Sequence, residues 1–242
     1  MRSAILSALA LLALAGPASA DGFSPAQRDE IVRIVRDALK NDPGILRDAL
    51  VALQGDEAKR QDKVTGDVLG LVGPKLVAAA DPVAGNPAGD VTIIEFYDTR
   101  CPYCRRMLPT VDALLKAEPN VRYVYKDWPI LGPTSQLESR ALLAAQRQGG
   151  YFKLQEALMR MSTPSTPDSI RAEADRLGLD GGRILRDMDD PAIKTRLDDN
   201  LALAQQIGLQ GTPAIIIGRK LIGGAVELAE LRQAVAEVRQ TK

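Results

Sequence analysis

The sequence VTIIEFYDTRCPYCRRM, residues 91–107, joins an apolar run to the only two cysteines of the chain. Residues 91–97 are rich in β-branched and aromatic side chains, which predicts a buried strand. Pro102 suits the first position of a helix, so Cys101 is the expected N-cap and Cys104 lies one turn further on. The stretch therefore predicts a strand followed directly by a helix, with a cysteine at the junction.

The cysteine pair has three possible roles: a structural staple, half of a metal site, or a redox centre. A disulfide across two intervening residues closes a very small loop and adds little stability. With two cysteines and no histidine, the chain holds half of a usual zinc site, and Arg105 after Cys104 excludes a C-x-x-C-H haem site. A helix start favours a thiolate. We therefore expect a redox pair in which Cys101 is the exposed nucleophile and Cys104 resolves the mixed disulfide.

The first residues have the features of a secretory signal peptide. Arg2 is followed by an apolar run over residues 4–15 and by Ala18-Ser19-Ala20, a small-x-small cleavage pattern. A membrane anchor is the alternative, but the run is short for a bilayer span. We predict cleavage after residue 20, a mature chain from Asp21, and a periplasmic location, where thiols tend to pair. The 31 basic and 31 acidic residues form no basic block, so no nucleic-acid partner is expected.

Residues 23–61 are expected to form two amphipathic helices. Ser24 and Gln27 fit a capping box, and Asn41-Asp42-Pro43 ends one helix and begins the next. The apolar stripes of this pair either pack back on the main domain or associate with other copies of the chain. The charged, glycine-containing residues 62–90 are expected to be a linker, either a hinge or a stiff arm.

The remaining sequence predicts an α/β domain with helices inserted into its middle. A strand–helix–strand unit comes first, then a helical block, then a strand–strand–helix unit. Beyond residue 120 the expected strands are 121–128, 213–218 and 220–226, and the expected helices are 134–148, 151–161, 167–177, 192–207 and 228–239.

Two further features surround the cysteine pair in the sequence. Pro213 opens a buried strand, where the Thr212–Pro213 bond is either a cis peptide or an ordinary trans strand start. If it lies against Cys101, the backbone of Thr212 can pair with an extended substrate chain. Three arginines also flank the cysteines: Arg100, Arg105 and Arg106. They are either plain surface charge or groups that hold a thiolate or contact an acidic partner.

Three segments, EFYDTRCPYC, KDWPILGPTSQLESRALLAAQRQGGYFKLQEALM and GLQGTPAIIIGRKLIGGAVELAELRQAV, resemble the DsbA-type thiol–disulfide oxidoreductases of the thioredoxin superfamily. The resemblance covers about residues 81–239. It implies a thioredoxin fold with an inserted helical domain, a cis bond at Pro213, and substrate binding by Thr212 and Pro213. It also implies a proton-relay pair, Glu95 with Lys126 as its basic partner. The catalytic set that it implies is Cys101, Pro102, Tyr103 and Cys104.

The segment FSPAQRDEIVRIVRDALKNDPGILRDALVALQ resembles the N-terminal part of the suppressor-of-copper-sensitivity C (ScsC-like) disulfide isomerases. This implies an N-terminal helical oligomerisation segment and a homo-oligomer, with a trimer favoured. Tyr103 stands where strong oxidants of the family carry histidine, so we expect a milder oxidant with a less depressed pKa at Cys101. Thr212, the residue before the proline, resembles the residue that disulfide isomerases carry at this position. The expected domains are 1–20 (signal peptide), 21–61 (oligomerisation segment), 62–90 (linker), 91–128 and 208–242 (thioredoxin fold) and 129–207 (helical insertion).

We therefore expect a disulfide isomerase that acts on exported cysteine-containing proteins. Its electron donor is expected to be a membrane thiol reductase, and its redox-active group is the Cys101–Cys104 disulfide, without a resident metal or other cofactor. Two alternatives stay open at this point: a DsbA-like dithiol oxidase, and a copper-tolerance module that binds Cu(I) through thiolates.

Overall fold

The computed structural model describes residues 22–241, so the predicted signal peptide and the predicted mature start at Asp21 lie outside the described residues. The chain divides into two compact units, one up to Glu57 and one from Ala58 onward. Within the described part of the chain, no helix is both long enough and apolar enough to span a membrane.

The first unit contains α1 (Pro25–Asn41) and the beginning of α2 (Pro43–Val72). The predicted capping box is confirmed: the Ser24 hydroxyl accepts the Gln27 N–H, and the Gln27 side chain accepts the Ser24 N–H. Helix α1 buries none of its residues. Many apolar side chains of the two helices are at least one-third exposed: Ile31, Val32, Ile34, Val35, Ile45, Leu46, Leu50, Val51 and Leu53.

Helix α2 runs further than predicted, through the first part of the expected linker. It continues past Gly66 and Gly70 to Val72, and a 3₁₀ turn follows at Gly73–Lys75. Both glycines lie against Arg219, since an added Cβ would be 3.4 Å from its carbonyl oxygen at Gly66 and 3.3 Å from its guanidinium at Gly70. Arg219 also forms an ion pair with Asp67 of the same helix at 2.7 Å. These glycines therefore mark a close approach of the chain and not the end of the helix.

The second unit is built on one mixed five-stranded sheet with the order β1-β3-β2-β4-β5. Strands β2 and β3 are parallel, and the other neighbouring pairs are antiparallel. The sequence pattern missed the short edge strand β1, which lies inside the expected linker. The strands are β1 (Val83–Gly85), β2 (Val91–Tyr97), β3 (Val121–Asp127), β4 (Ala214–Ile217) and β5 (Lys220–Gly223).

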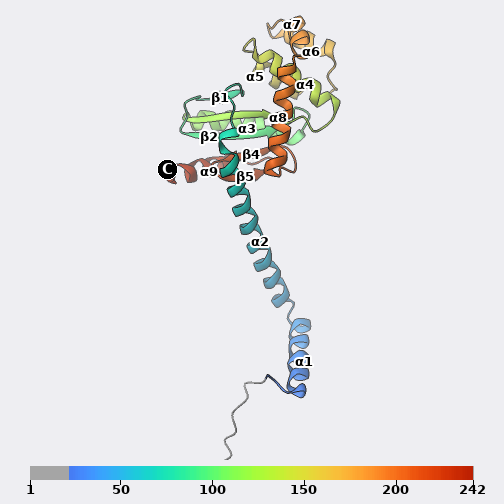
Figure 1. The fold of residues 1–242 in the computed structure, drawn as a ribbon, viewed down its shortest axis with the longest axis vertical. Coiled ribbons are helices and arrows are strands. Elements are labelled where there is room, and N and C mark those ends of the chain that lie inside the picture. The colour runs from blue at the N-terminus through green and yellow to red at the C-terminus, as the bar shows by residue number, and fades with distance from the viewer. Residues whose placement is uncertain (1–21, 242) are drawn as a thin grey trace, which may run out of the picture. The chain divides into compact units, whose positions relative to one another are not determined.

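Each face of the sheet has its own core, because side chains alternate along a strand. Ile93 and Tyr97 of β2 pack in the core that contains α3 (Pro102–Ala117) and α9 (Leu228–Gln240). Ile94 and Phe96 pack in the opposite core, with the end of α2 and with α8 (Pro191–Ile207). Helix α8 runs from the other helices of the insertion back along the sheet (Figure 1).

The helical insertion consists of four shorter helices before α8, namely α4 (Pro133–Gln146), α5 (Tyr151–Arg160), α6 (Pro167–Arg176) and α7 (Gly181–Asp187). The sequence pattern missed α7, because Asp180-Gly181-Gly182 resembles a loop. In fact Asp180 is its N-cap and accepts the Arg183 N–H. A buried hydrogen bond of 2.7 Å from the Tyr151 hydroxyl to Asp127 joins the insertion to the sheet. The expected thioredoxin fold with an inserted helical domain is confirmed.

Candidate functional site

Cys101 lies at the carboxyl end of the central strand, where the chain turns into α3. It is the N-cap of α3 with φ −70° and ψ 120°, and Pro102 is the first helical residue. Cys104 is on the first turn, and both cysteines are free thiols. The predicted junction is confirmed, but the prediction of an exposed nucleophile is wrong. Cys101 is only 4% exposed, because the backbone of Thr212 lies against its sulfur.

Asp98 organises the turn that carries Cys101. Its carboxylate is fully buried and accepts three backbone N–H groups: from Arg100 at 2.8 Å, Ile130 at 2.8 Å and Leu131 at 2.9 Å. Its backbone carbonyl also accepts the Cys101 N–H at 3.0 Å. The turn before α3 is thereby joined to the loop after β3. This connection fixes the position of Cys101 at the carboxyl end of β2, the central strand.

The segment before β4 forms the other side of the site. The Thr212–Pro213 peptide bond is cis, as predicted. The Cys101 Sγ lies 3.2 Å from the carbonyl oxygen of Thr212. The Pro213 carbonyl accepts the Gly224 N–H at 2.8 Å, which connects this turn to the end of β5. The structure therefore brings together the four residues that sequence analysis placed at the centre: Cys101, Cys104, Thr212 and Pro213.

The two thiols have opposite electrostatic environments. The hydrogen bond from the Cys104 side chain is the main cause that lowers the pKa of Cys101 to about 5. The Thr212 side chain and the backbone N–H groups of Cys104 and Tyr103 act in the same direction, whereas desolvation opposes them. Burial raises the pKa of Cys104 far above its usual range, and the hydrogen bond to Cys101 raises it further. At neutral pH the site therefore holds one thiolate and one thiol.

Glu95 is a buried carboxyl group on the side of the sheet that faces α3. Desolvation raises its pKa to about 8, and the hydrogen bond from Tyr123 partly offsets this increase. That bond runs from the Tyr123 hydroxyl to the Glu95 carboxylate over 2.9 Å. The charge of Glu95 in turn raises the pKa of Cys104. Glu95 is therefore coupled electrostatically to the less accessible thiol, and near neutral pH it can hold or release a proton.

The expected pairing of Glu95 with Lys126 is wrong. In the parallel register, Glu95 lies opposite Tyr125 and Phe96 lies opposite Lys126, so the acid and the lysine point to opposite faces. Lys126 instead forms a buried ion pair with Asp81 at 2.6 Å. The hydroxyl of Tyr123 takes the place beside Glu95 that the resemblance gave to a basic residue.

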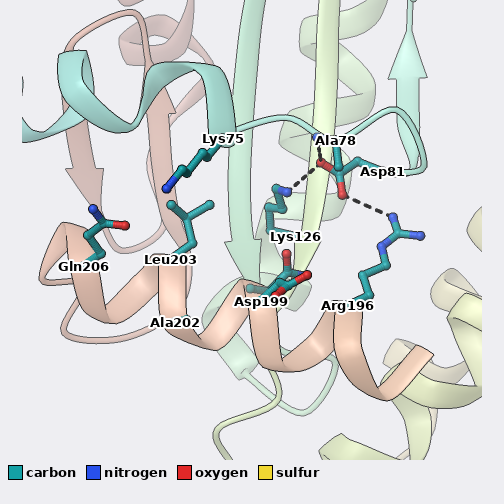
Figure 2. A pocket seen from close by; sticks show the side chains of 10 residues that line it. Lys75, Ala78, Asp81, Lys126, Arg196, Asp199, Ala202, Leu203 and Gln206 are labelled. Atoms are coloured by element: carbon teal, nitrogen blue, oxygen red, sulfur yellow. Dashed lines mark hydrogen bonds and ion pairs between the residues drawn. The ribbon is translucent and has the colours of Figure 1, made fainter. Parts of the chain in front are cut away.

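Figure 2 shows the surroundings of Lys126 on the far side of the sheet. Asp81 lies between Lys126 and Arg196, whose guanidinium is 3.2 Å from the other carboxylate oxygen. The Ala78 N–H also donates to Asp81, at 2.7 Å. These groups line a cavity of about 370 Å³ between the segment after α2 and helix α8. This cluster ties the end of the expected linker to the sheet and takes no part in the cysteine site.

The three flanking arginines have different surroundings. The Arg100 guanidinium lies 3.3 Å from the Thr163 carbonyl and 3.7 Å from the buried Glu138, so it contacts the helical insertion. Arg106 lies with its guanidinium carbon 4.4 Å from the centre of the Tyr103 ring. Arg105 is half-buried beside them. None of the three is among the main causes that lower the pKa of Cys101.

Sequence reasoning missed Asp98 and Tyr123. Asp98 directly follows the predicted strand and stands two residues before Arg100, a spacing typical of an aspartate that accepts a nearby backbone N–H. Tyr123 shares the side-chain alternation of its strand with Tyr125. That pattern indicates a common face, but the partner on that face follows only from the register with β2.

The fold and the paired thiols define the class of the thioredoxin-fold thiol–disulfide oxidoreductases. The family model described as "DSBA-like thioredoxin domain" matches residues 92–236, and the chain belongs to this family. A second model, described as "Copper resistance protein ScsC N-terminal domain", matches residues 27–60.

Known structures agree with this placement. A thioredoxin-like oxidoreductase from Silicibacter pomeroyi is 43% identical, covers 67% of this chain and 94% of its own, and superposes with a TM-score of 0.65. A Proteus mirabilis ScsC variant is 27% identical, covers 93% of this chain and all of its own, with a TM-score of 0.67. A Na⁺/H⁺ antiporter of Salinispora arenicola is 28% identical over 184 residues, which are 74% of this chain and 28% of the antiporter. The chain thus spans little more than a quarter of that curated relative.

We expect the alkylation rate of Cys101 in the reduced protein to fall as the pH drops through about 5, because only the thiolate reacts. An ordinary thiol loses reactivity near pH 8.5. Mass-spectrometric quantification of iodoacetamide labelling at each cysteine measures this profile. Cys104→Ala is expected to move the midpoint upward because it removes the largest cause of the shift, and Cys104→Ser, which keeps a donor, to move it less. A wild-type midpoint near 8.5 contradicts the assignment.

We expect Tyr123→Phe to raise the pKa of Glu95 from about 8 toward about 9, because the substitution removes a hydrogen bond to the carboxylate. Lys126→Met is the matched control, a second buried position of β3 on the other face. Difference infrared spectroscopy of the carboxyl band measures the pKa of Glu95 in the two variants, after each has been shown to be folded. The assignment is wrong if Lys126→Met shifts the Glu95 band and Tyr123→Phe does not.

Proposed function

We propose that the protein is a periplasmic disulfide isomerase that rearranges wrong disulfides in exported proteins. The observation that carries this proposal is the lowered pKa of Cys101, whose sulfur lies beside the Thr212 carbonyl. Cys104, whose pKa is raised, is the more deeply buried thiol of the pair. The backbone of Thr212 beside the sulfur suits an extended client segment, and the asymmetry of the two thiols suits a protein that arrives reduced. Tyr103, in the place of the histidine of strong oxidants, and Thr212, which resembles the residue of isomerases, support isomerisation over strong oxidation.

The proposed reaction begins when the Cys101 thiolate attacks one sulfur of a client disulfide. This forms a mixed disulfide and releases a client thiolate. That thiolate attacks a second client disulfide, and the thiolate released there attacks the client sulfur of the mixed disulfide. This last attack breaks the bond to Cys101 and releases its thiolate, so that no electrons are gained or lost overall. If the client stalls, Cys104 loses its proton and attacks Cys101, which frees a client reduced by two electrons. The resulting Cys101–Cys104 disulfide is then reduced again by a membrane thiol reductase, the proposed electron donor.

Glu95 is the proposed proton acceptor for Cys104 in that last step. The high pKa of Cys104 means that its thiol must be deprotonated at the moment of attack, since the thiolate is the nucleophile. A general base works best when its pKa lies near the working pH, and the pKa of Glu95 is about 8. Tyr123 is a positioning residue in this proposal, because it holds the carboxylate by its hydroxyl.

The N-terminal helices are proposed to join copies of the chain, with a trimer favoured. The exposed apolar residues of α1 and of the first turns of α2 lie in the segment that the ScsC N-terminal model matches. A second copy with the same stripes can cover them by coiled-coil-like packing. Several Cys101 sites would then act on one client at once, which favours isomerisation over a single transfer of a disulfide.

Refolding of a scrambled multi-disulfide protein tests the isomerase proposal. We expect Cys101→Ser to abolish the reaction, and the full chain with Val35→Asp and Leu50→Asp to become monomeric and to lose most of it, because charge disrupts the apolar seam. Arg36→Asp, at an exposed polar position of α1, is the control for added negative charge. Light scattering gives the mass of each variant.

Two outcomes would count against this proposal. Full activity in a monomeric double variant removes the role of oligomerisation. Rapid oxidation of a reduced client by the disulfide form, without rearrangement of scrambled disulfides, favours the DsbA-like dithiol oxidase instead.

Cu(I) binding is a second candidate function, favoured by the match to a copper-resistance N-terminal domain. The two thiols are soft donors of the kind that Cu(I) prefers. The raised pKa of Cys104 opposes the formation of a second thiolate, which places this candidate behind the isomerase.

A competition titration with a Cu(I) chelator tests the copper candidate. If the candidate is correct, the reduced protein binds Cu(I) and Cys101→Ser loses this binding, since one thiolate is removed. Equal binding by wild type and Cys101→Ser rules the candidate out.

A further inference from the structure

A groove lies beside the cysteine pair, between the start of α3 and the turn before β4. Its volume is about 610 Å³. Most of its lining is backbone and small or apolar side chains. An added Cβ at Gly211, Gly223 or Gly224 would meet no atom within 4 Å, so these positions border open space. The residues that line it are Tyr103, Arg106, Gly208, Leu209, Gln210, Gly211, Thr212, Ala214, Leu221, Gly223, Gly224 and Ala225.

Arg106 is the one ionised side chain in this lining. Within residues 22–241 no carboxylate lies within ion-pair distance of it, and its recorded contact is the stacking of its guanidinium on Tyr103 at 4.4 Å. An aromatic ring beneath a guanidinium holds its plane and leaves its N–H donors free for another partner. The groove therefore presents a fixed positive charge without an internal counter-ion.

The position of Arg106 does not stabilise α3. It lies in the second turn from the N-terminus, where the helix dipole disfavours a cation. Arg105 precedes it, so two like charges are adjacent. Neither arginine is among the main causes of the lowered pKa of Cys101. The charge of Arg106 thus does not stabilise the helix and is not a main cause of the lowered pKa, and Arg106 lines the groove beside the cysteine pair.

The spacing along α3 indicates where on a client this charge acts. Arg106 follows Cys101 by five residues of helix, about 7.5 Å along the axis at 1.5 Å per residue. An extended peptide rises about 3.3 Å per residue, so this length corresponds to about two client residues.

We propose that Arg106, stacked on Tyr103, makes this groove selective for client segments that carry an aspartate or glutamate about two residues from the reacting cysteine. This inference rests on the proposed function, since it requires that Cys101 exchanges disulfides with polypeptides. The acidic side chain pairs with the free guanidinium while the client backbone lies along Gly211 and Thr212.

The test uses matched peptides, each in a mixed disulfide, with glutamate or glutamine two residues from the cysteine. The quantity measured is the ratio of the exchange rates of the two peptides with the reduced full chain. We expect wild type to prefer the glutamate peptide by a factor of about two to five at low salt, the size of an exposed charge pair. The preference should vanish near 1 M salt, where the Debye length is about 3 Å.

Arg106→Gln is expected to bring the ratio to about one, and Arg106→Glu to reverse it, by the same charge interaction. Arg105→Gln is the matched control, since it removes an equal charge from a neighbouring position outside the groove lining and should keep the preference. A ratio cancels any effect of a variant on Cys101 itself. Exchange with both peptides at equal rates in wild type overturns this inference and leaves the proposed function standing, whereas no exchange with either peptide overturns both.

Discussion

The buried carboxylate of Asp98 is the constraint on which the geometry of the site depends. A buried charge is costly unless hydrogen bonds replace its hydration, and Asp98 receives three backbone N–H groups from two loops. Those bonds leave the Cys101 turn little freedom relative to the loop after β3. On the other side of the site, the Cys101 sulfur lies 3.2 Å from the Thr212 carbonyl oxygen, so the position of this turn sets that contact.

A fixed turn makes the two thiols unequal. Cys101 stands at the helix start, where N–H donors and the Cys104 thiol stabilise a negative charge, and Cys104 lies inside, where burial disfavours one. The same hydrogen bond between them favours the charge on Cys101 and opposes it on Cys104. The charge of Glu95 raises the pKa of Cys104 and so increases the difference between the two thiols. A thiolate and a thiol so arranged suit the proposed order of attack, in which Cys101 is the nucleophile and Cys104 resolves the mixed disulfide.

Local signals predicted the centre of this site, because the chemistry of a helix start and of an X-Pro turn is local. The roles of Cys101 and Cys104 remain proposals, but their placement and the cis bond at Pro213 are confirmed. Lys126 was misplaced because the face that a strand residue occupies depends on register, which a single strand does not contain. The length of α2 was underestimated because its glycines indicate a helix end locally, whereas this part of the helix contacts Arg219, which is far away in the sequence.

Tyr103 shows how a departure from the family pattern can redistribute roles within the motif. Where strong oxidants carry a histidine between the cysteines, this chain carries a neutral ring that adds only its backbone N–H to the stabilisation of Cys101. The main causes of the lowered pKa are hydrogen-bond donors at the helix start and at Thr212, and no cation is among them. Of the three flanking arginines, Arg106 lines the groove, with its guanidinium on the Tyr103 ring. In the proposed site, Thr212 both stabilises the thiolate and borders the client backbone, whereas the charge of Arg106 acts on the client alone.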